Sequence, residues 1–98
     1  MTGEIRLRPE VEGDLLEAAN WYEQQRIGLG TDFLDAVAVT LSRISAFPSA
    51  YPTVHRSTRR ALLPRFPFGV FYHVEDESVV VIAILHGSRH PRKWRNRL

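Results

Sequence analysis

The hydrophobic and polar positions of the chain divide it into a helical first half and a strand-rich second half. Residues 4–8 alternate between polar and apolar side chains, which predicts a short first strand. Residues 10–25 and 31–46 instead carry apolar side chains at helical spacing, which predicts two amphipathic helices. The spaced apolar residues are Val11, Leu15, Ala18, Ala19 and Tyr22 in the first helix, and Phe33, Val37, Leu41 and Ile44 in the second.

The segment between the predicted helices contains signals that end one helix and begin the next. Gly28 and Gly30 suit the left-handed backbone at a helix C-terminus, because glycine has no Cβ atom to oppose it. Thr31 is the predicted N-cap of the second helix, and the helix dipole favours Asp32 in its first turn. Pro48 then ends the helix. So short a connection predicts an antiparallel helical hairpin.

Three strands are predicted in the second half, at residues 58–63, 66–74 and 78–86. The middle one alternates, with Phe66, Phe68, Val70, Tyr72 and Val74 on one face. The last is almost wholly apolar, as expected of a central strand covered on both faces. Short turns between the strands, including the charged residues 75–77, favour an antiparallel meander. The expected fold is a single α+β domain over residues 1–98, of order β-α-α-β-β-β, with the helical hairpin packed on an antiparallel sheet.

The amino-acid composition indicates the cellular compartment in which the protein is expected. The chain has no cysteine, which excludes disulfides and thiolate metal sites and suits a reducing cytoplasm. The first residues do not resemble a signal peptide, and the longest apolar run, residues 79–85, is too short to cross a bilayer. We therefore expect a cytoplasmic protein that does not use a membrane.

Charge is distributed unevenly along the chain. Residues 1–50 carry a net charge of −4, and residues 51–98 carry +6. Twelve of the 13 basic residues are arginine, which binds carboxylate and phosphate in a planar, bidentate manner better than lysine does. The basic cluster near the C-terminus comprises Arg89, Arg92, Lys93, Arg95 and Arg97. A cationic face for an acidic protein segment or a nucleic acid is one reading, and a solvated surface is the other.

The residues that could perform chemistry are few. The chain has no G-x-S-x-G motif and no phosphate-binding loop, and no cofactor is expected. His86 and His90 are four residues apart, but Gly87 and Pro91 oppose the helix that would align them as metal ligands, so no metal site is predicted. One set could converge on a single sheet face and act on RNA, namely Arg60, Arg65, Tyr72, His86 and Arg89. Cleavage through the 2′-hydroxyl needs a base, an acid and a cation, and only His86 could transfer a proton.

Several patterns in succession resemble the ParE-like branch of the RelE/ParE toxins of type II toxin–antitoxin systems. They are residues 17–25, residues 29–34, Phe47-Pro48 with Tyr51-Pro52, Arg59-Arg60 with residues 65–72, and residues 86–91 followed by Trp94 and Arg97. The resemblance covers almost the whole chain, in the family's order. The family fold, β-α-α-β-β-β, agrees with the order of elements predicted above.

The resemblance implies one of two activities. RelE-like members cleave mRNA on the ribosome, and in this chain their catalytic positions would correspond to Arg60 and Arg89, with His86 as the acid–base candidate. Leu62, Gly69 and Arg95 stand where further catalytic residues are expected, so much of the ribonuclease apparatus is missing. ParE-like members inhibit DNA gyrase by binding, and we favour this non-enzymatic activity. A degenerate member that only binds antitoxin is a third alternative.

The expected partners are gyrase and a cognate antitoxin whose acidic, partly disordered segment folds over the toxin; no sequence-specific DNA binding is expected. The candidate contacts for target or partner are Arg60, Arg65, Tyr72, Arg89, Trp94, Arg95 and Arg97. Structural roles compete with several of these. Arg60 could lie across the sheet face and hold Tyr72 or an acidic neighbour, Arg89 could brace the C-terminus, and Trp94 could pack in the core or at its edge. Trp21 and Tyr22 are neighbours on one helix, so one should pack on the sheet, and the other, if exposed, is a candidate contact.

Overall fold

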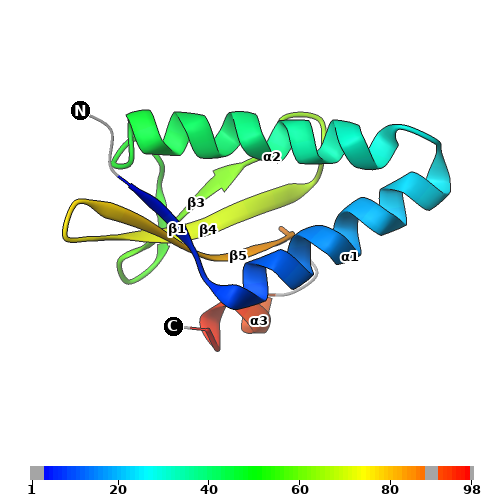
Figure 1. Cartoon of the computed structure of the whole chain (residues 1–98). Coiled ribbons are helices and arrows are strands. Elements are labelled where there is room, and N and C mark those ends of the chain that lie inside the picture. Colours follow the sequence, from blue (N-terminus) through cyan, green and yellow to red (C-terminus); the bar gives the residue numbers. More distant parts are fainter. Residues whose placement is uncertain (1–3, 88–90, 98) are drawn as a thin grey trace.

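The computed structural model describes residues 4–87 and 91–97 of the protein, and Figure 1 shows how its elements are arranged. The elements in chain order are β1 (Ile5–Leu7), α1 (Pro9–Gln25), α2 (Leu29–Ala46), β2 (Thr53–His55), β3 (Thr58–Leu62), β4 (Phe68–Glu75), β5 (Ser78–His86) and α3 (Pro91–Arg95). The hairpin of α1 and α2 covers one face of the sheet, and α3 packs against the other face. The predicted α+β class and helical hairpin are confirmed.

The five strands of the sheet follow the order β1-β5-β4-β3-β2. The meander from β2 to β5 is antiparallel, as predicted. β1, however, pairs in parallel with β5, with Ile5 opposite Val79, so the sheet is mixed rather than wholly antiparallel. No tight turn connects these two strands, because the helical hairpin and the meander separate them in the chain, and so nothing requires them to run in opposite directions.

β5 lies in the middle of the sheet and is buried on both faces, as its apolar sequence predicted. Residues Val79, Val81 and Ile84 belong to the core under the helical hairpin, and Val80, Ile82, Ala83 and Leu85 to the core under α3. The pairing between β4 and β5 shifts register where Phe71 and Tyr72 face Ala83 and Val81. This bulge turns the two adjacent residues Ile82 and Ala83 to the same face.

The turn between the helices is built differently from the prediction. α2 begins at Leu29, after Gly28 in the left-handed conformation (φ 91°), so the predicted N-cap role of the exposed Thr31 is wrong. The Glu23 carboxylate of α1 instead accepts hydrogen bonds from the backbone N–H groups of Gly28 (2.9 Å) and Gly30 (3.0 Å). A Cβ atom on Gly30 would lie 2.6 Å from the carbonyl oxygen of Ala19, so this glycine allows the two helices to touch.

Smaller differences occur at the strand ends. β4 begins at Phe68 rather than Phe66, although Phe66 is buried in the core from the preceding turn. Val74, which was placed on the same strand face as Phe68, Val70 and Tyr72, is 44% exposed. The short elements β2 and α3 were not predicted. None of the helices in the described part of the chain is long and apolar enough to cross a membrane.

Candidate functional site

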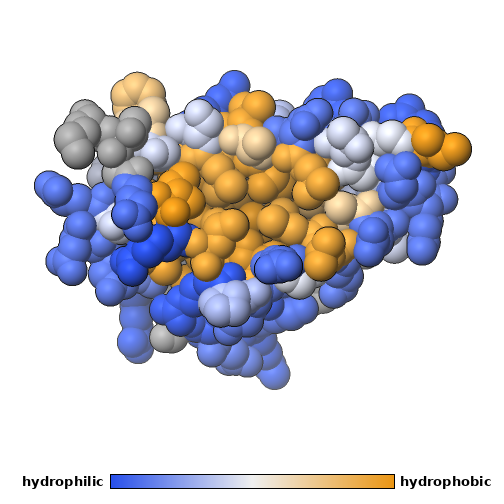
Figure 2. All heavy atoms as spheres, viewed as in Figure 1, coloured by the Kyte–Doolittle hydropathy of each residue, from blue (hydrophilic) through white to orange (hydrophobic). Residues whose placement is uncertain are grey.

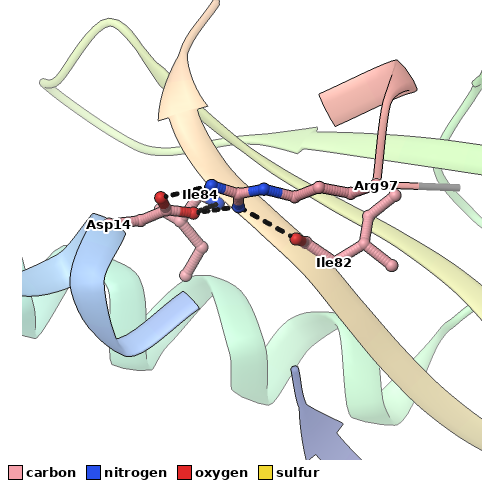
Figure 3. Close-up of polar contacts among 4 residues, drawn as sticks. All are labelled: Asp14, Ile82, Ile84 and Arg97. Atoms are coloured by element: carbon pink, nitrogen blue, oxygen red, sulfur yellow. Dashed lines mark hydrogen bonds and ion pairs between the residues drawn. The ribbon is translucent and has the colours of Figure 1, made fainter. Parts of the chain in front are cut away.

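Arg97 and Asp14 form a buried ion pair that joins the C-terminal segment to α1 and β5 (Figure 3). The Asp14 carboxylate accepts hydrogen bonds from both terminal nitrogens of Arg97, at 2.6 and 3.0 Å, and from the backbone N–H of Ile84 at 3.0 Å. Arg97 also donates to the carbonyl oxygen of Ile82 at 3.1 Å. β1 pairs with β5 only as far as Val81, so the two side chains satisfy backbone groups of β5 beyond the end of β1.

This geometry gives Arg97 a structural position. Its pKa is raised, chiefly by hydrogen bonding to Asp14, and its side chain is only 12% exposed. It was predicted to contact a target or partner, but its guanidinium group is held inside the protein. Sequence reasoning missed Asp14, although a signal existed. An acidic residue three positions after Val11 and four before Ala18 must share the inward face of the helix, where a charge needs a partner.

Tyr72 is fully buried on the sheet face that the helical hairpin covers. Its hydroxyl donates a hydrogen bond to the carbonyl oxygen of Pro48 at 2.6 Å, and burial raises its pKa to about 12. Arg59, opposite Tyr72 in the neighbouring strand, donates to the carbonyl oxygen of Tyr51. Tyr72 therefore anchors the loop after α2, and its side chain does not reach the surface.

Arg60 lies on the opposite face of the sheet from Tyr72. It pairs with Phe71, and its side chain crosses Gly69, where an added Cβ atom would lie 3.0 Å from the Cγ of Arg60. The Nε atom of Arg60 is buried and has no hydrogen-bond partner among the described residues. His86 is on the hairpin side, with its ring 5.7 Å from that of Phe68. The predicted convergence of Arg60, Tyr72 and His86 on one face is wrong. Arg59, not Arg60, lies opposite Tyr72, and neighbouring strand residues alternate between faces, so Arg60 points to the other side.

The other predicted contacts are dispersed. Trp94 is buried and stacks on Phe71, with 4.7 Å between ring centroids, which is the packing role considered for it. Arg95 is exposed, with its guanidinium group 5.4 Å from the centre of the Trp94 ring. Arg65 is also exposed but lies beside α2, where it pairs with Asp32 at 3.6 Å. Arg89 lies outside the described residues.

An apolar surface lies between α1 and α2, next to β1, and Figure 2 shows it at the centre of the view. The contact of Gly30 with Glu23 and Ala19 marks the sides on which the helices face one another. On those sides, and on β1, the apolar residues that remain partly or largely exposed are Leu7, Leu15, Leu16, Ala19, Leu34 and Leu41, which together we name the hairpin surface. Exposed apolar areas are where proteins bind partners, so the hairpin surface is a candidate site of protein–protein contact.

Trp21 adds an exposed aromatic on the other side of α1. Its side chain is 55% exposed, whereas Tyr22 packs against Phe33, Phe66 and Phe68. The expectation that one of the two aromatics packs on the sheet is therefore confirmed, and Trp21, which is exposed, is the one that remains a candidate contact.

Comparison with known proteins places this fold and sequence among toxins. The family described as "ParE toxin of type II toxin-antitoxin system, parDE" matches residues 5–91. Toxin ParE2 of Mycobacterium tuberculosis, in strains CDC 1551 / Oshkosh and ATCC 25618 / H37Rv, is 33% identical over 95 residues, which cover 93% of this chain and 88% of that protein.

Two solved structures share the fold. A chain of the chromosomal ParDE system from P. aeruginosa superposes with a TM-score of 0.77 at 12% identity, over 87% of this chain and 96% of that one. A chain of the RelBE2 toxin–antitoxin complex from Mycobacterium tuberculosis gives a TM-score of 0.64 at 20% identity, over 88% and 99%. The family match extends from β1 to the start of α3, and the chain therefore belongs to the ParE toxin family of type II toxin–antitoxin systems.

Proposed function

We propose that the protein inhibits DNA gyrase by binding to it in the cytoplasm, without catalysing a reaction. The observation that supports this most is the position of Arg60 and His86 on opposite faces of the sheet. A ribonuclease needs its proton-transfer group and its phosphate-binding cation around one scissile bond. A toxin that acts by binding needs exposed surfaces that contact its target, and no such convergence of catalytic groups.

The hairpin surface is the site that we propose for the antitoxin. Leu7, Leu16 and Leu34 are 45%, 58% and 44% exposed, so a partner would remove much apolar area from water there. An amphipathic helix laid into a groove is a recurrent way to cover such a surface. Arg6 and Arg8 alternate with Leu7 along β1 and, together with Glu75, line a small hollow on the other face of this edge strand; they would attract an acidic segment of the antitoxin that continues around the edge. The two solved relatives come from the ParDE and RelBE2 toxin–antitoxin systems, which is consistent with an antitoxin partner.

Expression of the chain alone in a bacterial host tests the proposed target. DNA synthesis and protein synthesis are pulse-labelled separately after induction. Inhibition of gyrase predicts that DNA synthesis fails first, and that the purified chain blocks supercoiling by purified gyrase. An early collapse of translation with continuing replication would show that the proposal is wrong.

Ribosome-dependent mRNA cleavage is the second candidate, and one observation favours it. The Nε atom of Arg60, which has no hydrogen-bond partner within the described part of the chain, lies on the sheet face that carries α3, whose Arg92, Lys93 and Arg95 are exposed. Cations on one surface attract a phosphate backbone. If this activity exists, Arg60→Ala abolishes cleavage of ribosome-bound mRNA, whereas Arg43→Ala, an exposed change on α2, does not.

A further inference from the structure

A cleft separate from the hairpin surface opens on the other side of α1. Its volume is about 570 Å³, within the range that side-chain anchors and small ligands occupy. Residues of α1 form one wall, the ends of β4 and β5 form the floor, and Lys93 of α3 stands at the opposite wall. The apolar part of the lining includes Ala18, Trp21, Phe68 and Ile84. We name this space the α1–α3 cleft.

Trp21 is held in position at the wall of this cleft although more than half of its side chain is exposed. Its ring meets Tyr22 edge to face, with 5.1 Å between centroids and an angle of 84°. Tyr22 in turn packs against Phe66 at 4.9 Å and Phe33 at 5.4 Å, so the support of Trp21 extends into the core. A large exposed aromatic that is already ordered loses little conformational entropy when a partner covers it, and such residues dominate binding at protein interfaces.

The two walls of the α1–α3 cleft carry opposite charges. Glu17 lies on the α1 wall and Lys93 on the α3 wall, and both residues are exposed. Neither forms an ion pair within residues 4–87 and 91–97. Asp14 also lines the cleft, but Arg97 neutralises it. A ligand that fits these walls therefore presents a cation toward α1 and an anion toward α3, on either side of an apolar group.

The cleft and the hairpin surface lie on different sides of the same helix. Leu15 and Ala19 turn toward α2, whereas Glu17 and Trp21, by their helical spacing, turn away from it. A partner helix seated on the hairpin surface leaves the cleft open. Two surfaces of different chemistry are thus available for two partners.

We propose that the α1–α3 cleft is the docking site of the target protein, which inserts an aromatic side chain beside Trp21 and flanks it with one basic and one acidic residue. Assigning the occupant to the target rather than to the antitoxin rests on the function proposed above. The chemistry of the occupant rests only on the cleft, and the two parts are tested separately.

A peptide titration tests the chemistry. The probe is the blocked pentapeptide Lys-Gly-Trp-Gly-Glu, followed by NMR of the isotope-labelled protein. We expect saturable shifts at Trp21 and Lys93, weakened about tenfold when alanine replaces the peptide's tryptophan. The wild type should prefer this peptide to versions with two lysines or two glutamates. Glu17→Lys should switch the preference to the version with two glutamates, whereas Glu12→Lys, an exposed change on α1 outside the cleft, should not. Absence of saturable shifts, or shifts at the hairpin surface, would overturn the proposal.

Growth inhibition tests the identity of the occupant, with Leu16→Ala on the hairpin surface as the matched control for Trp21→Ala. We expect Trp21→Ala to reduce growth inhibition about a hundredfold in colony counts and to keep antitoxin binding and the melting temperature. Leu16→Ala should remain toxic and bind antitoxin less tightly. If Trp21→Ala stays toxic but loses antitoxin binding, the occupant is the antitoxin and the assignment to the target is wrong. If the wild-type chain is not toxic at all, the proposed function fails, and the peptide titration alone decides the site.

Discussion

Replacing Arg97 by methionine should destabilise the protein by about 3 kcal/mol, because it leaves the Asp14 carboxylate buried without a cation. The Asp14 side chain is 3% exposed and, among the described residues, would keep only the hydrogen bond from the Ile84 N–H. Removing one partner of a buried ion pair costs about 3–5 kcal/mol. The Arg97 side chain is 12% exposed, so water can reach part of the vacated space, and we expect the lower end of this range. Methionine keeps an apolar stem, which limits the loss of packing.

The double replacement Asp14→Leu with Arg97→Met distinguishes the cost of an uncompensated charge from the cost of losing the hydrogen bonds to the β5 backbone. It removes the uncompensated charge, so part of the stability should return, by about 1 kcal/mol or more. Recovery should be incomplete, because the N–H of Ile84 and the carbonyl of Ile82 lose their partners. The comparison thus measures how much of the ion pair's effect comes from completing β5.

Urea unfolding followed by circular dichroism gives these free energies. Arg26→Met is the control, because Arg26 and Asp32 form an exposed pair at 3.9 Å that should contribute less than about 1 kcal/mol. A loss of about 3 kcal/mol corresponds to a fall in melting temperature of roughly 12 °C or more for a domain of this size. If Arg97→Met costs no more than Arg26→Met, the Asp14–Arg97 pair does not brace the fold.

Three further predictions concern the core and the turns. Gly30→Ala should destabilise by about 1–3 kcal/mol, because its Cβ would meet the Ala19 carbonyl, whereas Gly13→Ala, with open space around it in α1, should stabilise by about 0.5–1 kcal/mol; thermal melting compares the two. Glu77 lies in the turn between β4 and β5 at φ 66°, and its replacement by glycine should raise the free energy of unfolding by about 0.5 kcal/mol. An unchanged or lower melting temperature of Glu77→Gly would contradict this. The raised pKa of Tyr72 means that the folded state holds the hydroxyl proton more tightly than the unfolded state, so its contribution is complete below pH 10 and is lost as the pH rises to about 12. Tyr72→Phe should therefore flatten the alkaline fall in melting temperature, and Tyr51→Phe should not.

The periodicity of apolar residues predicted most of the fold, because the buried residues of each helix and strand recur at regular spacing along the chain. The inward positions of α1 and α2 and the two-faced burial of β5 follow from local spacing alone. The parallel pairing of β1 could not be predicted in this way, because Ile5 and Val79 are brought together by the whole intervening chain. β2, with three residues, is too short for a period to be visible.

The candidate site was less predictable, because its geometry depends on strand register. Arg59 and Arg60 are neighbours of the same residue type, and only the pairing of β3 with β4 decides which of them shares a face with Tyr72. The structure selects Arg59, which holds the loop after α2. The sequence identified Trp21 as a candidate contact but gave no sign of the cleft beside it, since Lys93 reaches that cleft only through the packing of α3.

The parallel pairing of β1 with β5 also affects the order in which the protein can fold. β5 is contacted by residues from both ends of the chain. Ile5 pairs with Val79, and the Asp14–Arg97 ion pair binds the β5 backbone at Ile82 and Ile84. Contacts between such distant residues form slowly, because the chain must lose much conformational entropy before they contribute. The hairpin of α1 and α2 needs only local contacts and can form early, during synthesis, with its inward apolar residues still uncovered. A partner that bound the hairpin during that interval would assist the toxin's folding as well as restrain the finished molecule.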